Sequence, residues 1–226
     1  MKVFVVVALH GEEVFGLKVA GKIQLLHNDD FMIRVGHPEA VAKGQRYIEK
    51  DLNRSFRVDQ KSVEASLAQG ILREINTYNP DYIIDIHTSV SNVRQVAIVA
   101  QYCEKTEYLS RTLGMDSMVV MPRRFNQNSL IGCFPDKAIS IEFGKNQRSD
   151  KLAANLANRC NALDVDFVNT GSLLPVFEAV TTIEKDFTGL ANIVNLEFNH
   201  ELGGYPFLAG KDTYSSIGGF LTKKIV

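Results

Sequence analysis

The chain has 226 residues and a formal net charge of −1 at pH 7, with 25 Lys and Arg side chains against 26 Asp and Glu. Hydrophobic residues make up 45% of it and charged residues 23%, as in ordinary globular domains, which excludes a disordered chain. The even charge balance argues against a nucleic-acid partner. No apolar run approaches the roughly 20 residues that a membrane helix needs. The length allows one sizeable core and a small second unit.

The N-terminus and the cysteines both favour a cytoplasmic protein. The segment MKVFVVVALHGEE has a short apolar run followed at once by a histidine and two acids, whereas a signal peptide needs a longer run and a small-residue cleavage site. Cys103, Cys133 and Cys160 are widely spaced and form no CxxC pair, which argues against a disulfide framework and a cysteine-rich zinc site. Buried, reduced thiols are a simpler interpretation than a catalytic cysteine.

Hydrophobic patterning predicts alternating strands and helices as far as residue 168. The strands are expected at 2–8, 31–36, 81–86, 94–100, 117–121 and 138–143. The helices are expected at 12–26, 38–43, 60–78, 103–113 and 150–168, with a long polar loop at 44–57. This alternation predicts an α/β fold with a largely parallel sheet and helices on both faces.

The pattern of hydrophobic residues changes after Gly171. Short β-like runs separated by glycines follow one another, and no segment has a helical period; the runs are 173–182, 191–198, 204–209 and 217–225. We therefore expect two units, an α/β domain at 1–170 and a small β-rich unit at 171–226 that packs against it.

Histidines and carboxylates follow three of the predicted strands. His10 and Glu13 come after the first strand, His87 comes after the third, and Glu142 lies near the end of the sixth. In open α/β sheets, ligands bind beyond the carboxyl ends of strands. We therefore expect these side chains to converge at one edge of the sheet.

Two imidazoles and one carboxylate at this edge would suit a metal. His10 and Glu13 are three residues apart, so a turn permitted by Gly11 can point both to one side. With His87 they would leave one position of a tetrahedral zinc ion open to water, and Asp85 could orient His87. The alternative is a locally hydrogen-bonded histidine and a solvated acid. The spacing alone leaves the two interpretations balanced.

Glu142 follows a buried strand, AISI, and precedes FG. A carboxylate at the mouth of a core strand is costly unless it is paired or used. It is either a general base beside a metal-activated water or a strand-end glutamate in a salt bridge, and its position alone does not separate these roles.

The loop RYIEKDLNR carries side chains that can bind carboxylates and developing oxyanions. Arg46, Asn53 and Arg54 supply guanidinium and amide donors. The alternative is a solvated polar loop, and Asp51 fits both interpretations because it can also orient an arginine.

Together these segments resemble the succinylglutamate desuccinylase/aspartoacylase family. The resemblance rests on HGEEVFG, GHPEAVAKGQRYIEKDLNRSF, DIHTSVSN and ISIEFG in that order, and DLNR followed by an aromatic residue is its most specific piece. It covers about residues 1–150. The family is related to the zinc carboxypeptidases and hydrolyses the amide of N-acyl amino acids, so the resemblance implies a mixed, largely parallel sheet and one Zn²⁺ per chain.

The resemblance also implies a role for individual residues. His10, Glu13 and His87 match the zinc ligands. Glu142 matches the general base that later protonates the leaving amine, and Arg46 matches the arginine that polarises the scissile carbonyl.

Other matches concern the substrate. Asn53 and Arg54 match the pair that binds the substrate α-carboxylate, and Tyr214, in YPFLAGKDTY, matches a substrate-contacting tyrosine. Aspartoacylase-like members carry a further arginine shortly before the catalytic glutamate, and GCFPDKAISIE has none at that place. The candidates to replace it are Arg123, Arg124 and Lys137.

Histidines outside the metal pattern are interpreted as structural. His27 and His37 have no partner pattern, and His200 is expected on a loop or at the surface.

The sequence thus predicts a zinc-dependent amidohydrolase that acts on a small anionic N-acyl amino acid. The alternatives are a zinc carboxypeptidase that cleaves short peptides and a metal- or ligand-binding relative without turnover. The acyl group, the amino acid and the oligomeric state stay open, and a homo-oligomer is compatible with the sequence.

Overall fold

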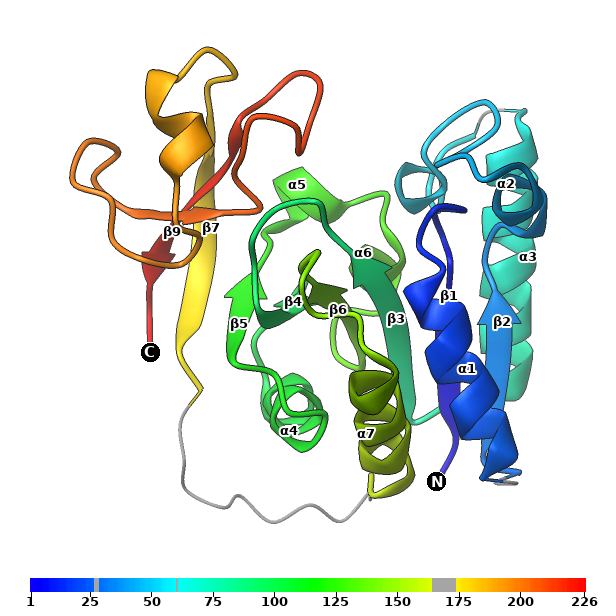
Figure 1. The fold of residues 1–226 in the computed structure, drawn as a ribbon. Helices are drawn as coiled ribbons and strands as arrows, with labels where there is room; N and C mark the ends of the chain where they lie inside the picture. Colours follow the sequence, from blue (N-terminus) through cyan, green and yellow to red (C-terminus); the bar gives the residue numbers. More distant parts are fainter. Residues whose placement is uncertain (27–28, 60, 164–173) are drawn as a thin grey trace.

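A computed structural model describes residues 1–26, 29–59, 61–163 and 174–226, whose strands form a nine-stranded sheet in the order β2-β1-β3-β6-β4-β5-β7-β9-β8 (Figure 1). The strands are β1 (Val3–Val7), β2 (Phe31–Val35), β3 (Tyr82–Thr88), β4 (Gln95–Val99), β5 (Ser117–Val120), β6 (Ala138–Phe143), β7 (Val176–Ile183), β8 (Tyr205–Phe207) and β9 (Gly219–Lys224). Five of the eight pairings between them are parallel, which confirms the expected mixed, largely parallel sheet.

Helices lie on both faces of the sheet (Figure 1). They are α1 (Phe15–Leu25), α2 (Pro38–Lys43), α3 (Val63–Tyr78), α4 (Glu104–Thr112), α5 (Arg123–Asn126), α6 (Leu130–Cys133) and α7 (Asp150–Asn161), with 3₁₀ turns η1 (Leu52–Arg54) and η2 (Thr188–Asn192). Apolar residues of α1, α4 and α7 pack on one face, and those of α3, α6 and η1 pack on the other. This two-sided cover explains why the central strands read as nearly continuous apolar runs.

The strands at the centre of the sheet alternate between these two cores. In β3, Ile84 and Ile86 face the α1–α4–α7 core, and Ile83 faces the α3–α6 core. Asp85 and His87 have the parity of Ile83, because successive residues of a strand point to opposite faces. The polar side chains of β3 therefore lie on the α3–α6 side, at the carboxyl end of the strand.

The C-terminal strands continue the same sheet. β7 pairs parallel with β5, and β9 and β8 follow in antiparallel pairings. These strands also enclose a small apolar cluster of their own around Ile183, Leu190 and Ala209. The β-rich character of this segment is confirmed. The division into 1–170 and 171–226 stays a prediction, because its boundary lies outside the described residues.

The run predicted at 191–198 is not a strand. It holds the end of η2 and irregular chain, with Leu196 at a φ of 61°. The side chain of Asn195 binds the backbone of Ala209 twice, accepting from its N–H at 2.8 Å and donating to its C=O at 3.2 Å. Asparagine side chains that bind backbone groups in this way compete with a strand ladder.

Most other element boundaries agree with the sequence. The first helix begins at Phe15 rather than at residue 12, because residues 11–12 form a turn. Helix α7 ends at Asn161, so the predicted helix is wrong over 162–163, and its further extension over 164–168 lies outside the described residues. The short helices α5 and α6 have four residues each, too few for a periodic signal, and were not predicted.

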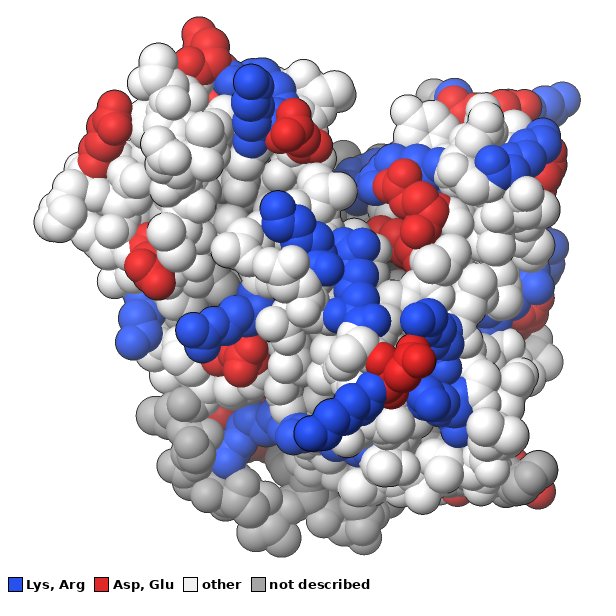
Figure 2. All heavy atoms as spheres, viewed as in Figure 1, with Lys and Arg blue, Asp and Glu red and all other residues white. Residues whose placement is uncertain are grey.

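The lengths of the helices and the charges on the surface bear on whether the protein binds a membrane or a nucleic acid. Among the described residues, no helix is long and apolar enough to cross a membrane. Both signs of charge occur on the face in Figure 2, so this face is not a continuous basic surface. All three cysteines are described, and none is disulfide-bonded.

The central strands carry much of the stability. Replacing Ile84 by Ala removes a fully buried side chain from the α1–α4–α7 core and should lower the free energy of unfolding by about 2–5 kcal/mol. The matched change Val180→Ala, at a residue that is 37% exposed on β7, should cost much less. Urea unfolding measures both. Equal losses would contradict this placement of the core.

Candidate metal centre

The first two candidate ligands lie in a tight turn directly after β1. Ala8 leaves the strand with a φ of 53°, a conformation that costs an alanine about 1–2 kcal/mol. The N–H of Glu13 then donates to the C=O of His10 at 3.0 Å, so the two side chains project to the same side. A Cβ at Gly11 would lie 2.2 Å from the carbonyl carbon of Ala40 in α2, so only glycine fits there.

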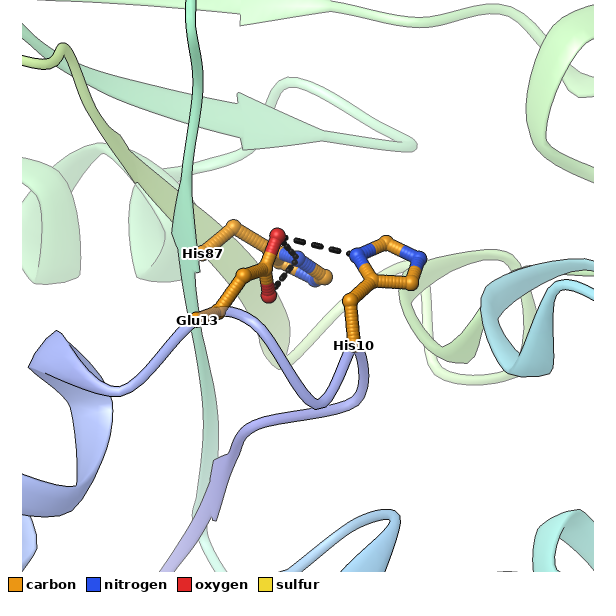
Figure 3. Close-up of side chains that lie close together, drawn as sticks. All are labelled: His10, Glu13 and His87. Carbon is orange, nitrogen blue, oxygen red and sulfur yellow. Dashed lines mark hydrogen bonds and ion pairs between the residues drawn. The ribbon is translucent and has the colours of Figure 1, made fainter. Parts of the chain in front are cut away.

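Three side chains from this turn and from β3 meet in one buried cluster (Figure 3). The Glu13 carboxylate lies between two imidazoles, 2.9 Å from Nδ1 of His10 and 3.1 Å from Nδ1 of His87. Candidate ligand atoms of the three residues all lie within 4.8 Å of one another. The side chains predicted to bind a metal are therefore brought together.

The outward-facing nitrogen of each imidazole has its own carboxylate. Nε2 of His10 donates to Asp51 at 3.0 Å, and Nε2 of His87 donates to Asp85 at 2.6 Å. The hydroxyl of Ser140 on β6 also donates to Asp85, at 2.9 Å. Each Nδ1 lies within hydrogen-bond distance of the Glu13 carboxylate, so in the metal-free cluster it donates to Glu13. A bound cation would replace the Nδ1 protons, while the two aspartates keep the proton on each Nε2. Two imidazole nitrogens and one carboxylate oxygen are a donor set that suits zinc and leaves a coordination position open.

Without a cation, protons must balance the charge of the cluster. Burial lowers the pKa of His10, but Glu13 and Asp51 outweigh it and raise that pKa above its usual value. The pKa of His87 is raised well above its usual value, since Asp85 and Glu13 outweigh burial. Burial raises the pKa of Glu13, but the two imidazoles hold it far below its usual value. A divalent cation would supply this positive charge in place of the protons.

Glu142 lies beside the cluster. It is the β6 neighbour of His87 in the parallel register of β3 and β6, and it is 7% exposed. Burial raises the pKa of its carboxyl to about 7, with Glu13 adding to the rise and His87 opposing it. A carboxyl with this pKa can accept and return a proton near neutral pH.

Arg46 is held against the same cluster by two carboxylates. Its Nη1 donates to Glu12 at 3.2 Å and its Nη2 to Asp51 at 3.4 Å, and Nη2 lies 3.2 Å from Nε2 of His10. Burial raises the pKa of Asp51, but the hydrogen bond from His10 and the nearby arginines lower it strongly. Asp51 is therefore a carboxylate that links the imidazole of His10 to the guanidinium of Arg46.

The segment DLNR turns Asn53 towards His87. Asp51 caps η1 by accepting from the N–H of Asn53 at 2.8 Å. The Asn53 amide oxygen accepts from the N–H of Leu130 at 3.1 Å, which leaves its Nδ2 3.4 Å from Nε2 of His87. Arg54 is exposed, and its Nη1 donates to the C=O of Asn53 at 2.9 Å.

Tyr214 reaches this region from the C-terminal strands. It lies between β8 and β9, is half-buried, and packs edge-on against Phe220 with ring centres 5.7 Å apart. Burial and the Glu142 carboxylate raise the pKa of its phenol, and Arg54 opposes them. The phenol is thus within electrostatic range of the predicted base and of the predicted carboxylate-binding arginine.

Comparison with known proteins bears on the family of the chain and on its fold. A family model described as "Succinylglutamate desuccinylase/Aspartoacylase catalytic domain" matches residues 1–166, most of the chain. The chain belongs to this family. A probable aspartoacylase from Nostoc sp. is 31% identical over 107 residues, which are 41% of this chain and 36% of that protein. The alignment thus spans little more than a third of that curated relative.

Solved structures of this family and of carboxypeptidases share the fold. Succinylglutamate desuccinylase from Chromobacterium violaceum superposes with a TM-score of 0.77 at 17% identity, over 100% of this chain and 85% of that one. A metallo-carboxypeptidase from Burkholderia cenocepacia superposes with a TM-score of 0.55 at 12% identity, over 71% of this chain and 56% of that one. The carboxypeptidase-like architecture expected of the succinylglutamate desuccinylase/aspartoacylase family is confirmed.

Two of the three candidates for the missing arginine of this family bind backbone elsewhere. Arg124 donates to the C=O groups of Ala179 and Val180 in β7. Lys137 donates to the C=O of Pro80 at 2.9 Å, at the start of β6, whereas Glu142 lies near the end of that strand. Arg123 is exposed on α5.

The remaining histidines and some contacts add detail. His37 is fully buried and caps α2, in line with a structural role. His200 is exposed, and His27 lies outside the described residues.

The contacts from Asp51 to His10 and from Glu12 to Arg46 were not predicted. For the contact of Asp51 with His10, the only sequence signal is that Asp51 stands two residues before Asn53, which is the spacing of an N-terminal cap.

The metal-free protein should lose stability as the pH rises. His10 and His87 have pKa values above those of the unfolded chain, so their stabilising effect is complete below about pH 6.5 and is lost as the pH passes through the folded values. Chelator-treated protein should therefore have a smaller free energy of unfolding in urea at about pH 9 than at about pH 6. His87→Gln should weaken this dependence. A free energy that increases over this range would contradict the assignment.

Proposed function

We propose that the protein is a zinc-dependent hydrolase that cleaves the amide bond of an N-acyl amino acid. The observation that carries the proposal is the buried set of His10, Glu13 and His87 with Glu142 directly beside it. Membership of the succinylglutamate desuccinylase/aspartoacylase family supports the reaction class. A bound zinc ion would polarise a carbonyl oxygen and lower the pKa of a water molecule.

The protein's own proton carrier in this scheme is Glu142. Its carboxylate takes a proton from the attacking water as the oxygen adds to the amide carbon, and it returns the proton to the nitrogen as the carbon–nitrogen bond breaks. Burial favours the neutral form of this carboxyl, so Glu142 can hold the proton between the two transfers.

Arg46 stabilises the charge that develops on the carbonyl oxygen. Its guanidinium is already oriented by Glu12 and Asp51, so little reorganisation is needed during the reaction. Donors fixed in this way are typically worth about 10²–10³ in rate.

The substrate carboxylate is bound by Asn53 and Arg54, which fixes the amide relative to the catalytic groups. Tyr214 contacts the substrate from the C-terminal side. A small anionic substrate needs local positive charge at the site rather than a basic protein, so the net charge of −1 is compatible with this scheme.

The direct test is the release of free amino acid from a panel of N-acetyl, N-succinyl and N-formyl amino acids, with short peptides in parallel. Hydrolysis of the acylated amino acids together with zinc in the purified protein supports the proposal. Cleavage of peptides alone would favour a carboxypeptidase. A protein without tightly bound divalent metal, and with no activity restored by zinc, would rule out the mechanism.

Glu142→Gln should abolish turnover and leave metal binding intact. The amide cannot accept the proton, so kcat should fall by about 10³-fold or more. Metal analysis should still find about one zinc ion per chain, because the predicted ligands are unchanged. Glu39→Gln, at an exposed glutamate paired with Lys43, is the matched control and should retain full activity. Substantial turnover by Glu142→Gln would show that another group is the base.

A further inference from the structure

A buried carboxylate lies behind the site and is not used by the proposed reaction. Glu64 is in the first turn of α3 and is fully buried. The helix does not need it as a cap, because the hydroxyl of Ser62 already accepts from the N–H of Ala65 at 3.0 Å. An ionised carboxylate in such a place is unfavourable unless hydrogen bonds compensate its lost hydration.

The hydrogen bonds of Glu64 go to the segment that carries the proposed substrate-binding groups. Its Oε1 accepts from the backbone N–H of Ile48 at 2.9 Å and of Glu49 at 2.8 Å. Burial raises the pKa of Glu64, but these two N–H groups and His37 lower it to about 2, so the group is ionised. Glu49 in turn accepts from the N–H of Val63 in α3 at 3.2 Å.

This segment, residues 45–54, has no regular structure before η1. The two anchored amides therefore lie between Arg46 on one side and Asp51 and Asn53 on the other. A carboxylate that holds two successive backbone N–H groups fixes the course of the chain through them.

The same carboxylate is connected to the metal-ligand turn. Nε2 of His37 donates to Oε1 of Glu64 at 3.2 Å, and the backbone N–H of His37 donates to the C=O of Ala8 at 3.0 Å, two residues before His10. Glu64 thus joins the end of β1 to segment 45–54 through buried hydrogen bonds.

We propose that Glu64 is a positioning residue that fixes segment 45–54, and with it Arg46 and Asn53, against the metal-ligand turn. It does not itself contact the cluster of His10, Glu13 and His87 through any of these bonds. Its effect on catalysis rests on the function proposed above, whereas its hold on the segment can be measured without any substrate.

The first measurement is amide hydrogen exchange of Glu64→Gln. Loss of the charge weakens the bonds to both anchored amides, so exchange at Ile48 and Glu49 should be faster by about tenfold or more. Exchange in the middle of α3 should not change. Glu74→Gln is the matched control, because it neutralises a partly exposed glutamate on the same helix that pairs with Arg34. Unchanged exchange at the anchored amides would overturn the proposal.

A second variant guards against a general loss of structure. His37→Asn retains a side-chain oxygen to cap α2 and removes one of the bonds to Glu64. It should accelerate exchange at the same amides by a smaller factor. If it has no effect on them, the connection through His37 is wrong.

The second measurement is the steady-state kinetics of zinc-loaded protein on the best substrate from the panel. Displacement of both Arg46 and Asn53 should raise KM as well as lower kcat, with kcat/KM reduced by about tenfold or more and the zinc content unchanged. Partial unfolding alone would lower the active fraction and leave KM unchanged, and that result would refute the positioning role. If the wild type hydrolyses no N-acyl amino acid, the proposed function fails, and the exchange data alone decide the role of Glu64.

Discussion

The arrangement of the site depends on one buried carboxylate between two imidazoles. Glu13 is almost fully enclosed, and it can stay ionised there because His10 and His87 supply compensating charge or, with a metal bound, share it as a ligand. Each imidazole is in turn oriented by an aspartate. Burial makes every partner obligatory, since an unpaired charge at this depth is strongly unfavourable. The backbone adapts to this requirement, with Ala8 in a left-handed conformation and Gly11 packed against α2.

The alternation of side chains in the central sheet also places the polar residues of the site. The alternation of β3 and β6 places apolar residues on one face and Asp85, His87, Ser140 and Glu142 on the other. The ligand, its orienting carboxylate and the proposed base therefore come from two adjacent strands with a fixed register. The groups proposed to bind the substrate come instead from an irregular segment, which needs an anchor such as Glu64 because it has no ladder of its own.

The sequence predicted the parts of the molecule that follow from local pattern. The positions of His10, Glu13 and His87 after two predicted strands indicated that these side chains converge, because parallel strands share one carboxyl edge. Their spacing alone did not decide whether they bind a metal. The contact of Asp51 with His10 was not predictable, since it joins residues 41 positions apart through a loop of no regular period. The run at 191–198 was mistaken for a strand because its apolar residues alternate, while Asn195 binds the backbone of Ala209 instead. The pairing of β7 with β5 leaves no local signature in either strand.

That pairing restricts how the protein can move. Tyr214 is carried by strands that continue the central sheet through the β5–β7 ladder, rather than by a body attached through a single linker. Rigid-body closure of the C-terminal strands over the site would have to break main-chain hydrogen bonds in that ladder. Under the function proposed above, adaptation to substrates of different size would therefore occur in the connection between β8 and β9, where Lys185 donates to the C=O groups of Lys211 and Tyr214. Changes of specificity among relatives with this sheet should accumulate in that connection and leave the strands as they are.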